Sequence, residues 1–311
     1  MLILEILGLL ILGMALLYFG AEGVVSSGIR LAARCGLTPL AIGLTVVAFG
    51  TSSPELAVSI KAALSGSGDI AIGNVVGSNI ANIALIIGVC ALIRPIKVST
   101  QIIQLDIPLM LLISLIVAAM IGGGSLSRIA GVGLFTALIA YSAFNYFYAK
   151  NGAKTTSIEE REDKQPLIKT LLWLIGGLAF LVGGASVFVH GAVKAAKIMG
   201  FSEATIGLTI VALGTSLPEL ATSVVASLKN ENDIALGNVV GSNVFNLLGI
   251  LGVTAMITPL TTSGVGILDI GVMLMTSLAL LPIARSGFTI SRFEGAFLLA
   301  IWCGYIYYLL A

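Results

Sequence analysis

Charged residues are scarce in this sequence. Asp, Glu, Lys and Arg make up 10% of its 311 residues and hydrophobic residues 58%, whereas a soluble globular chain carries roughly 25% charged residues. So few charges cannot keep a folded surface in water, and a net charge of +1 provides no basic surface for nucleic acid. We therefore predict an integral membrane protein whose main surroundings are the lipid bilayer.

Cysteine and histidine, the residues that bind soft metals, are almost absent. The three cysteines, Cys35, Cys90 and Cys303, lie far apart and His190 is the single histidine, which fits neither a disulfide framework nor a zinc or copper site. The apolar segments also lack the Ser–His or paired-Asp arrangement that an intramembrane enzyme would need. We expect no cofactor, no enzymatic activity and no obligate protein partner.

Long hydrophilic runs are missing as well, apart from residues 151–166. The N-terminus has no basic leader and no cleavage site, so we expect it to be a retained helix. Ten apolar stretches suit an ~30 Å hydrocarbon core: residues 2–28, 38–64, 70–92, 104–122, 128–148, 167–193, 204–228, 234–257, 265–284 and 293–310. The predicted fold is an all-α integral membrane protein with ten transmembrane helices, five in residues 1–150 and five in residues 167–311, joined by a cytoplasmic loop at 151–166.

The two halves repeat one another. Residues 36–88 and 200–252 are identical at more than half of their positions, including "GTSSPEL" against "GTSLPEL" and "GNVVGSNIAN" against "GNVVGSNVFN". Because each half has an odd number of spans, the second must enter the membrane inverted relative to the first. Two inverted five-helix repeats are typical of secondary transporters, whose substrate site lies near the midplane between the copies.

The basic residues predict the orientation. With the loop at 151–166 inside, only four of the 16 Lys and Arg residues fall outside, namely Lys61, Arg128, Lys194 and Lys197. This bias follows the positive-inside rule. It predicts a multi-pass protein of the cell membrane with both termini extracellular or periplasmic.

Each repeated motif places one glutamate, Glu55 or Glu219, in an apolar span. Oxygen-bearing side chains recur at steps of three or four around each glutamate, on the same helix face. Pro54 and Pro218 have no amide proton and crowd the carbonyl four residues back, so each frees a backbone oxygen and bends its helix. The second block adds polar side chains at four-residue spacing, and glycines that allow close helix approach: Asn74, Ser78, Asn82, Gly73 and Gly77, with Asn238, Ser242, Asn246, Gly237 and Gly241 in the copy.

A bare carboxylate in the bilayer costs at least ~2.5–3.5 kcal/mol, and two at one site repel each other. A hard cation removes both penalties, because carboxylates, carbonyls and hydroxyls form the oxygen shell that Ca²⁺ prefers. The alternative is that Glu55 and Glu219 are structural, each a neutral acid hydrogen-bonded across a helix interface.

These paired motifs and the ten-span plan resemble the alpha repeats of the cation/calcium antiporter superfamily, in its sodium/calcium exchanger branch; the chain is similar to a compact prokaryotic member. The resemblance implies that the first and sixth helices, within residues 1–25 and 166–190, slide as a gate. It implies a central cation site and flanking sodium sites built from the side chains of Glu55, Glu219, Asn82, Asn246, Ser52, Ser216, Ser78 and Ser242 and the backbone oxygens of Ala48, Thr51, Ala212 and Thr215.

The implied function is a secondary active antiporter that exchanges Ca²⁺ for Na⁺ by alternating access, with both ions as substrates. Family members that co-transport K⁺ carry Asp at the position of Asn246, so we expect exchange here to be independent of K⁺. The alternative is an antiporter of H⁺ against Ca²⁺ or another divalent cation that uses the same two glutamates. The paired serines Ser52 and Ser216 favour sodium, because a proton needs only the carboxylate.

Overall fold

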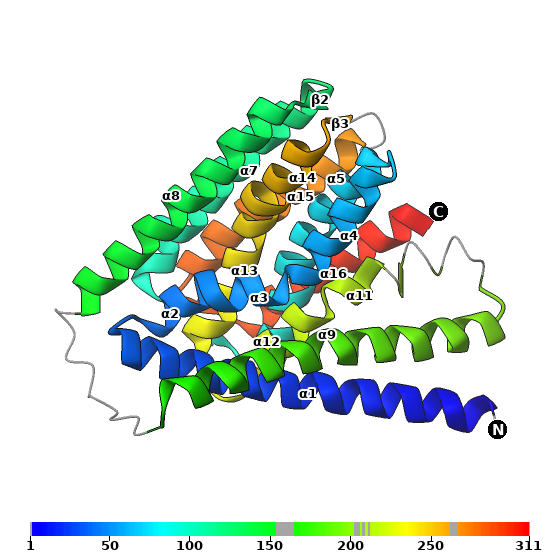
Figure 1. Ribbon diagram of the computed structural model, residues 1–311, viewed down its shortest axis with the longest axis horizontal. Helices are drawn as coiled ribbons and strands as arrows, with labels where there is room; N and C mark the ends of the chain where they lie inside the picture. Colours follow the sequence, from blue (N-terminus) through cyan, green and yellow to red (C-terminus); the bar gives the residue numbers. More distant parts are fainter. Residues whose placement is uncertain are drawn as a thin grey trace.

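The computed structural model describes residues 2–153, 165–201, 206, 209–210, 212–261 and 266–310. These residues form an almost wholly helical protein (Figure 1). The strands among them are two residues long and join into two antiparallel pairs, β1 (Ile96–Lys97) with β4 (Thr289–Ile290) and β2 (Ser125–Leu126) with β3 (Leu260–Thr261). Each pair links a segment of the first half of the chain to one of the second half.

Helices fill the chain between these pairs, and several contain π-helical segments, labelled η. The first half consists of α1 (Leu2–Cys35), α2 (Pro39–Ile42), η1 (Gly43–Val47), α3 (Ala48–Thr51), α4 (Ser53–Leu64), α5 (Gly68–Ile80), η2 (Ala81–Ile87), α6 (Gly88–Ile93), η3 (Ile102–Asp106), α7 (Ile107–Gly122) and α8 (Arg128–Ala153). The second half consists of α9 (Leu167–Ile198), α11 (Ala212–Thr215), α12 (Leu217–Leu228), α13 (Asn232–Val244), η5 (Phe245–Ile250), α14 (Leu251–Ile257), α15 (Ile267–Arg285) and α16 (Arg292–Leu310).

Eight continuous helical segments among the described residues are long and apolar enough to cross a membrane, and the bent pair Pro39–Thr51 and Ser53–Leu64 makes a ninth. This confirms an all-helical chain with several candidate spans. The predicted span at 204–228 and the predicted loop at 151–166 lie partly outside the described residues. The count of ten spans, the inversion of the halves and the domain limits therefore stay predictions.

Burial separates a central layer from a peripheral one. In the most apolar window of Asn232–Ile257, 83% of residues are buried inside the protein, and in that of Gly68–Ile93 the share is 72%. The corresponding share is 17% for α1 and 28% for α9. The repeated "GNVV" blocks thus lie on central helices, whereas α1 and α9 present most of their apolar side chains outward.

Helices α1 and α9 lie side by side along one edge of the bundle (Figure 1). Small residues bring their backbones together, as at membrane helix interfaces in general: a Cβ added to Gly20 would lie 2.7 Å from the Gly177 carbonyl oxygen, and one added to Gly184 would lie 2.8 Å from the Leu17 amide nitrogen. Two glycines facing each other therefore allow a contact between backbones that no larger residue permits.

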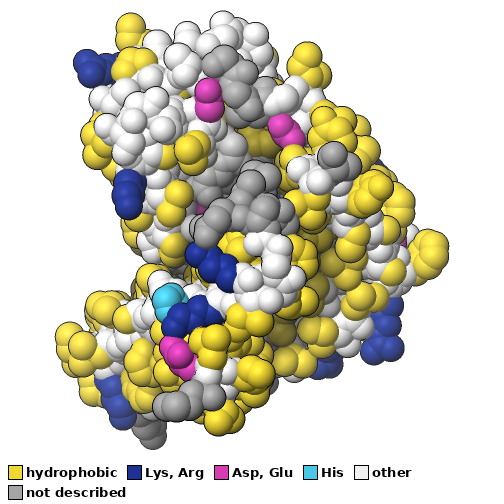
Figure 2. All heavy atoms as spheres, turned by 90° about the vertical axis from the view of Figure 1, so that its right-hand side faces the viewer, with side chains coloured by type: hydrophobic (Ala, Val, Ile, Leu, Met, Phe, Trp, Pro, Cys, Tyr) yellow, Lys and Arg dark blue, Asp and Glu magenta, His cyan; other side chains and the backbone are white. Residues whose placement is uncertain are grey.

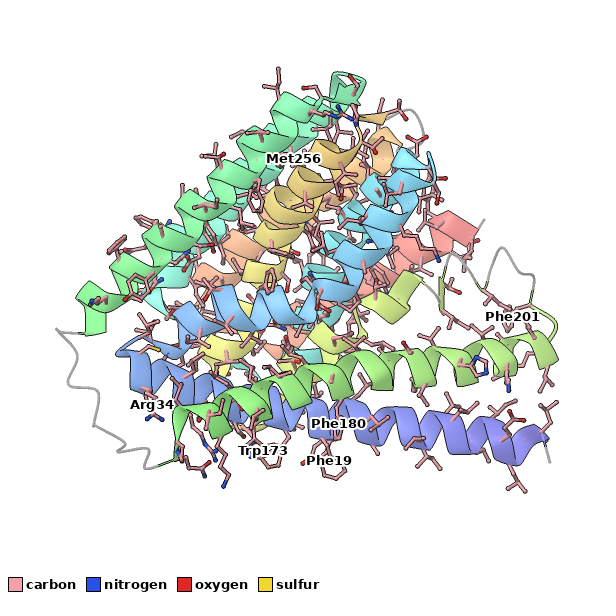
Figure 3. The ribbon with its side chains drawn as sticks, in the orientation of Figure 1. Phe19, Arg34, Trp173, Phe180, Phe201 and Met256 are labelled. Carbon is pink, nitrogen blue, oxygen red and sulfur yellow. The ribbon has the colours of Figure 1, made fainter. Side chains whose placement is uncertain are left out.

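Figure 3 shows the aromatic side chains of Phe19 and Trp173 pointing away from the bundle on the outer side of this pair, and that of Phe180 lying over the pair in this view. All three are at least half exposed. Figure 2 shows another face, where hydrophobic side chains gather along the margins and several Lys, Arg, Asp and Glu side chains lie among them. The many exposed large hydrophobic side chains of the helices suit lipid tails and would be unstable in water, in agreement with a multi-pass membrane protein.

The predicted close approach of glycines holds for one copy of the motif. A Cβ at Gly237 would lie 3.0 Å from the Leu40 carbonyl oxygen and one at Gly241 would lie 2.5 Å from that of Leu44, so α13 packs directly on α2 and η1. At Gly73 and Gly77 no described atom lies within 4 Å of the added Cβ. The residues that correspond to Leu40 and Leu44 in the second copy, at positions 204 and 208, lie outside the described residues, so close approach at Gly73 and Gly77 stays a prediction.

Candidate cation site

Two helix breaks position the repeated glutamates. Helix α3 ends at Thr51 and α4 begins at Ser53, with Ser52 between them at φ −84° and ψ 6°; the two helical stretches meet at an angle of 46°. The copy breaks at Ser216, at φ −87° and ψ 4°, between α11 and α12. In each copy a proline follows within two residues and prevents continuous helical hydrogen bonding. Both predicted breaks are present.

Each break leaves a glutamate in the first turn of the next helix, Glu55 on α4 and Glu219 on α12. The partial positive charge of a helix N-terminus favours a carboxylate there. Both residues are only 1% exposed, and each accepts a hydrogen bond from the serine at the break of the opposite half. The two halves thus bring their carboxylates together, as the sequence predicted.

The serines at the breaks bond across the two halves. Ser52 Oγ donates to Glu219 Oε1 at 2.8 Å, and Ser216 Oγ donates to Glu55 Oε1 at 3.1 Å. The second carboxylate oxygen, Oε2, is buried in both glutamates and has no hydrogen-bond partner. Each serine therefore holds one oxygen of the opposite glutamate and leaves the other oxygen open to a ligand.

A second layer of bonds fixes the helices that carry the carboxylates. Asn238 Nδ2 donates to the backbone oxygen of Glu219 at 3.4 Å and to Ser223 Oγ at 3.0 Å. Asn74 Nδ2 makes the same pair of bonds in the other half, to the backbone oxygen of Glu55 at 3.2 Å and to Ser59 Oγ at 3.0 Å. These asparagines tie each glutamate helix to the central helix that follows it in sequence.

The remaining predicted site residues with hydroxyl groups are Ser78, Ser242, Thr51 and Thr215. Ser216 Oγ also donates to Ser78 Oγ at 3.4 Å, and Ser242 Oγ is buried without a partner. Thr51 lies beside Glu219, and Thr215 lies beside Glu55.

The structure describes the surroundings of one predicted backbone ligand, Ala48, more fully than those of its counterpart Ala212. The Ala48 carbonyl oxygen accepts from the Ser52 amide at 3.0 Å and from Thr51 Oγ1 at 3.3 Å. Ala212 begins α11, and its side chain lies outside the described residues.

The carbonyl oxygens that the prolines were expected to free are not equivalent. Ser53 Oγ donates to the Gly50 carbonyl oxygen within the first break, so this oxygen is already engaged. The copy has Leu217 in place of Ser53, and a leucine cannot make this bond. Our prediction that both motifs offer such a free carbonyl was therefore incomplete for the first one.

Asn82 and Asn246 lie 1% exposed at the beginnings of η2 and η5. Their amide nitrogens donate at 3.0 Å, Asn82 Nδ2 to Asn243 Oδ1 and Asn246 Nδ2 to Asn79 Oδ1. Their own Oδ1 atoms are buried and have no partner. The sequence analysis did not include Asn79 and Asn243. Each copy of the motif has one of them, three residues before its predicted site residue, Asn82 or Asn246.

The other acidic residues with described partners bond elsewhere. Glu5 pairs with Lys194 and Glu22 with Lys229, all partly exposed, and Asp269 accepts from the Tyr305 hydroxyl at 2.9 Å. Asp69 and Asp233 lie in the first turns of α5 and α13, where helix starts favour acidic residues. None of these contacts involves the two central glutamates.

Among the predicted site residues, five buried side-chain oxygens have no hydrogen-bond partner: Glu55 Oε2, Glu219 Oε2, Asn82 Oδ1, Asn246 Oδ1 and Ser242 Oγ. Neither glutamate forms an ion pair with a Lys or Arg among the described residues, and unpaired buried charges are strongly unfavourable. The donor set holds carboxylate, amide and hydroxyl oxygens and no nitrogen or sulfur, which suits a hard cation such as Ca²⁺ or Na⁺.

Known proteins resemble the chain over almost its whole length. The chain is 38% identical to the putative antiporter CaxA of Alkalimonas amylolytica, over 96% of this chain and 97% of the relative. It is 33% identical to the sodium/calcium exchanger MaX1 of Methanosarcina acetivorans, over 96% of both chains. The solved structure of the sodium-calcium exchanger NCX_Mj, soaked with zero Na⁺ and Ca²⁺, superposes with a TM-score of 0.86 at 34% identity, covering 99% of this chain and 100% of that one.

The family described as sodium/calcium exchanger protein matches residues 5–147 and 169–311, one stretch on each side of the middle loop. Both stretches contain one broken helix with its glutamate and one asparagine-bearing central helix. The match across both halves, the likeness in fold and the oxygen-lined site lead to one conclusion: the chain belongs to the sodium/calcium exchanger protein family.

Proposed function

We propose that this protein is a secondary active antiporter that moves Ca²⁺ across the cell membrane in exchange for Na⁺. The observation that supports this most is the pair of buried carboxylates, Glu55 and Glu219, each with one oxygen held by a serine of the opposite half and one oxygen free. Two negative charges balance one Ca²⁺, and the neutral oxygens around them complete a shell of the kind that Ca²⁺ takes.

Exchange follows when both ions need the same oxygens. Ca²⁺ would lie between the two carboxylates with Asn82 and Asn246, while Na⁺ ions would use the same carboxylates together with the hydroxyls of Ser52, Ser216, Ser78 and Ser242. An empty site leaves two repelling carboxylates buried in a medium of low dielectric constant. The empty protein therefore crosses between its two facing states slowly, and a bound ion is required for each crossing.

Helices α1 and α9 are the moving part in this proposal. They form a closely packed pair at the edge of the bundle, joined through facing glycines, so they can shift together without disturbing the central helices. The carboxylates lie on α4 and α12, which pack nearer the centre. A shift of the pair would open the site first to one side of the membrane and then to the other.

Independence from K⁺ follows from the charge of the site. Asn82 and Asn246 are neutral, so the glutamates supply both of the site's charges. A Ca²⁺ ion neutralises them, and an additional K⁺ would carry an uncompensated charge at a cost of several kcal/mol. We therefore expect exchange that needs Na⁺ and is indifferent to K⁺.

Exchange of Ca²⁺ for H⁺ is the second candidate, because buried carboxylates can carry protons. The serine hydroxyls favour Na⁺: Ser52 and Ser216 donate to the glutamates and have lone pairs left for a sodium ion. A proton carrier needs only the carboxylate and gives these hydroxyls no role.

Proteoliposomes separate these possibilities. Purified protein is reconstituted and Ca²⁺ uptake is followed under an imposed gradient of Na⁺, of K⁺ or of pH, with membrane potential clamped by an ionophore. We expect uptake with an internal Na⁺ load, unchanged when K⁺ is replaced by choline on both sides. Uptake driven by a pH gradient without Na⁺ would favour the proton exchanger, and a collapse of flux without K⁺ would contradict the charge argument.

A further inference from the structure

The orientation of the two site amides is set by residues outside the cation shell. Asn82 and Asn246 can each present either an oxygen or an NH₂ group to the site, because an amide side chain has both at its end. Only the oxygen can bind a cation. Something must therefore hold both amides with their oxygens inward.

The first chain of bonds begins at an atom that can only accept. Asn79 Nδ2 donates to the backbone carbonyl oxygen of Asn243 at 3.4 Å, which fixes the amide of Asn79 with its nitrogen toward that carbonyl. Asn79 Oδ1 then faces the opposite way and accepts from Asn246 Nδ2 at 3.0 Å. Because its nitrogen is used there, Asn246 keeps its own oxygen buried and without a partner, available to a cation.

The second chain of hydrogen bonds also begins at an atom that can only accept, here the sulfur of Met110. Asn243 Nδ2 donates to the thioether sulfur of Met110 at 3.5 Å, and a thioether can only accept. Asn243 Oδ1 therefore faces Asn82 Nδ2, from which it accepts at 3.0 Å. Asn82 in turn is left with its oxygen free and buried.

The two chains cross between the halves of the protein. Asn79, on α5, orients the amide of η5, and Asn243, on α13, orients the amide of η2. Both orienting residues are 1% exposed, so water does not compete for their bonds. We propose that Asn79 and Asn243 are positioning residues that select the oxygen-inward orientation of Asn246 and Asn82 and thereby raise the affinity of the site for Ca²⁺; this inference rests on the proposed function.

A carboxylate at the same place would need no such help, because both of its ends are oxygens. This difference gives a test that a merely structural role cannot pass. Asn79→Leu removes the accepting oxygen at similar volume, and it is made in the wild type, in Asn246→Asp and in Asn82→Asp. Ca²⁺ binding is measured by calorimetry on purified protein in detergent, and thermal unfolding without Ca²⁺ checks the fold of each variant.

We expect Asn79→Leu to weaken Ca²⁺ binding about fivefold in the wild type, the effect of one lost hydrogen bond. The same change should weaken binding by about fivefold in Asn82→Asp, whose Asn246 still needs orienting, and by less than about twofold in Asn246→Asp. Asn79→Ala, which removes the same oxygen and leaves space, is used if the leucine variant does not fold.

An equal loss in all three backgrounds, or no loss in the wild type, would overturn the positioning role while leaving the proposed function intact. A wild-type protein that binds no Ca²⁺ in calorimetry would overturn both. Asn243→Leu supplies the mirror experiment, in which the loss should vanish in Asn82→Asp and persist in Asn246→Asp.

Discussion

At the scale of single residues, the two glutamates share three features. Both are buried, one in each half of the chain. Each accepts a hydrogen bond from a serine of the opposite half and keeps its second carboxylate oxygen without a partner. A neutral, structural carboxylic acid would donate its O–H in a hydrogen bond to a nearby acceptor. The free oxygens instead suit a ligand that brings positive charge of its own.

Glu55→Gln and Glu219→Gln should each leave the fold intact and remove exchange. Each change deletes half of the negative charge that balances Ca²⁺, and an unbalanced buried charge costs about 3–5 kcal/mol, or at least two orders of magnitude in affinity. The measurements are Ca²⁺ flux in proteoliposomes and the rise in melting temperature that bound Ca²⁺ gives by mass action.

The matched control is Glu5→Gln, which neutralises an exposed glutamate on α1 that pairs with Lys194. It should retain both the flux and the Ca²⁺-dependent rise in melting temperature. Normal flux in either central variant would contradict the assignment of the glutamates as ligands.

At the scale of helices, glycine positions decide how closely α1 and α9 approach. A Cβ at Gly177 would lie 2.8 Å from the Gly20 carbonyl oxygen and 3.0 Å from the Val24 amide nitrogen, both of which are backbone atoms that cannot move aside alone. The neighbouring Gly176 has no described atom within 4 Å of its added Cβ. The two glycines are adjacent in sequence but lie on different faces of α9.

Gly177→Ala should therefore push α1 and α9 apart, costing about 1–3 kcal/mol of stability by overpacking and slowing exchange more than it weakens Ca²⁺ binding. Gly176→Ala should leave the rate unchanged and stability within about 1 kcal/mol. Flux rates, calorimetry and thermal unfolding on the same preparations test this pair. Equal effects of the two substitutions would argue against a close α1–α9 contact in the working protein.

The sequence was sufficient for the broken helices, because Pro54 and Pro218 act through local geometry, and for the oxygen-bearing residues around them. It was insufficient for Asn79 and Asn243. Their roles depend on which way the central helices face, and π-helical segments begin at Ala81 and Phe245 and change the rotation between these asparagines and the rest of each helix. Regular helical periodicity cannot locate such a change.

The Gly50 carbonyl shows a second kind of limit. Pro54 predicts that this oxygen loses its backbone N–H donor, and it does. The hydroxyl of the neighbouring Ser53 donates a hydrogen bond to it instead. A rule about backbone hydrogen bonds cannot tell which side chain will replace the missing amide. The same rule applied to Gly214 meets Leu217, which is the one difference between the motifs "GTSSPEL" and "GTSLPEL".

At the scale of the whole molecule, the proposed orientation places the loop at 151–166 in the cytoplasm and both termini outside. The evidence is the excess of Lys and Arg on one side of the predicted spans. The side of the membrane on which a residue lies can be tested by labelling a single introduced cysteine, once the three native cysteines have been replaced.

Glu159→Cys should resist an impermeant thiol reagent on intact cells and react after the membrane is permeabilised. Ser127→Cys, on the exposed turn before α8, should react without permeabilisation, because the same topology places it outside. Ready labelling of position 159 on intact cells, or protection of position 127, would reverse the topology.

A site with only two charges also has an electrical consequence. Ca²⁺ bound between Glu55 and Glu219 gives a loaded carrier with no net charge, and such a carrier crosses the membrane field without gaining or losing electrical energy. A third Na⁺ beyond the two that balance the carboxylates would add one elementary charge. Moving that charge across a membrane potential of 100 mV changes its electrical energy by about 2.3 kcal/mol. The neutrality of Asn82 and Asn246 therefore assigns any voltage dependence of exchange to the sodium-loaded half of the cycle.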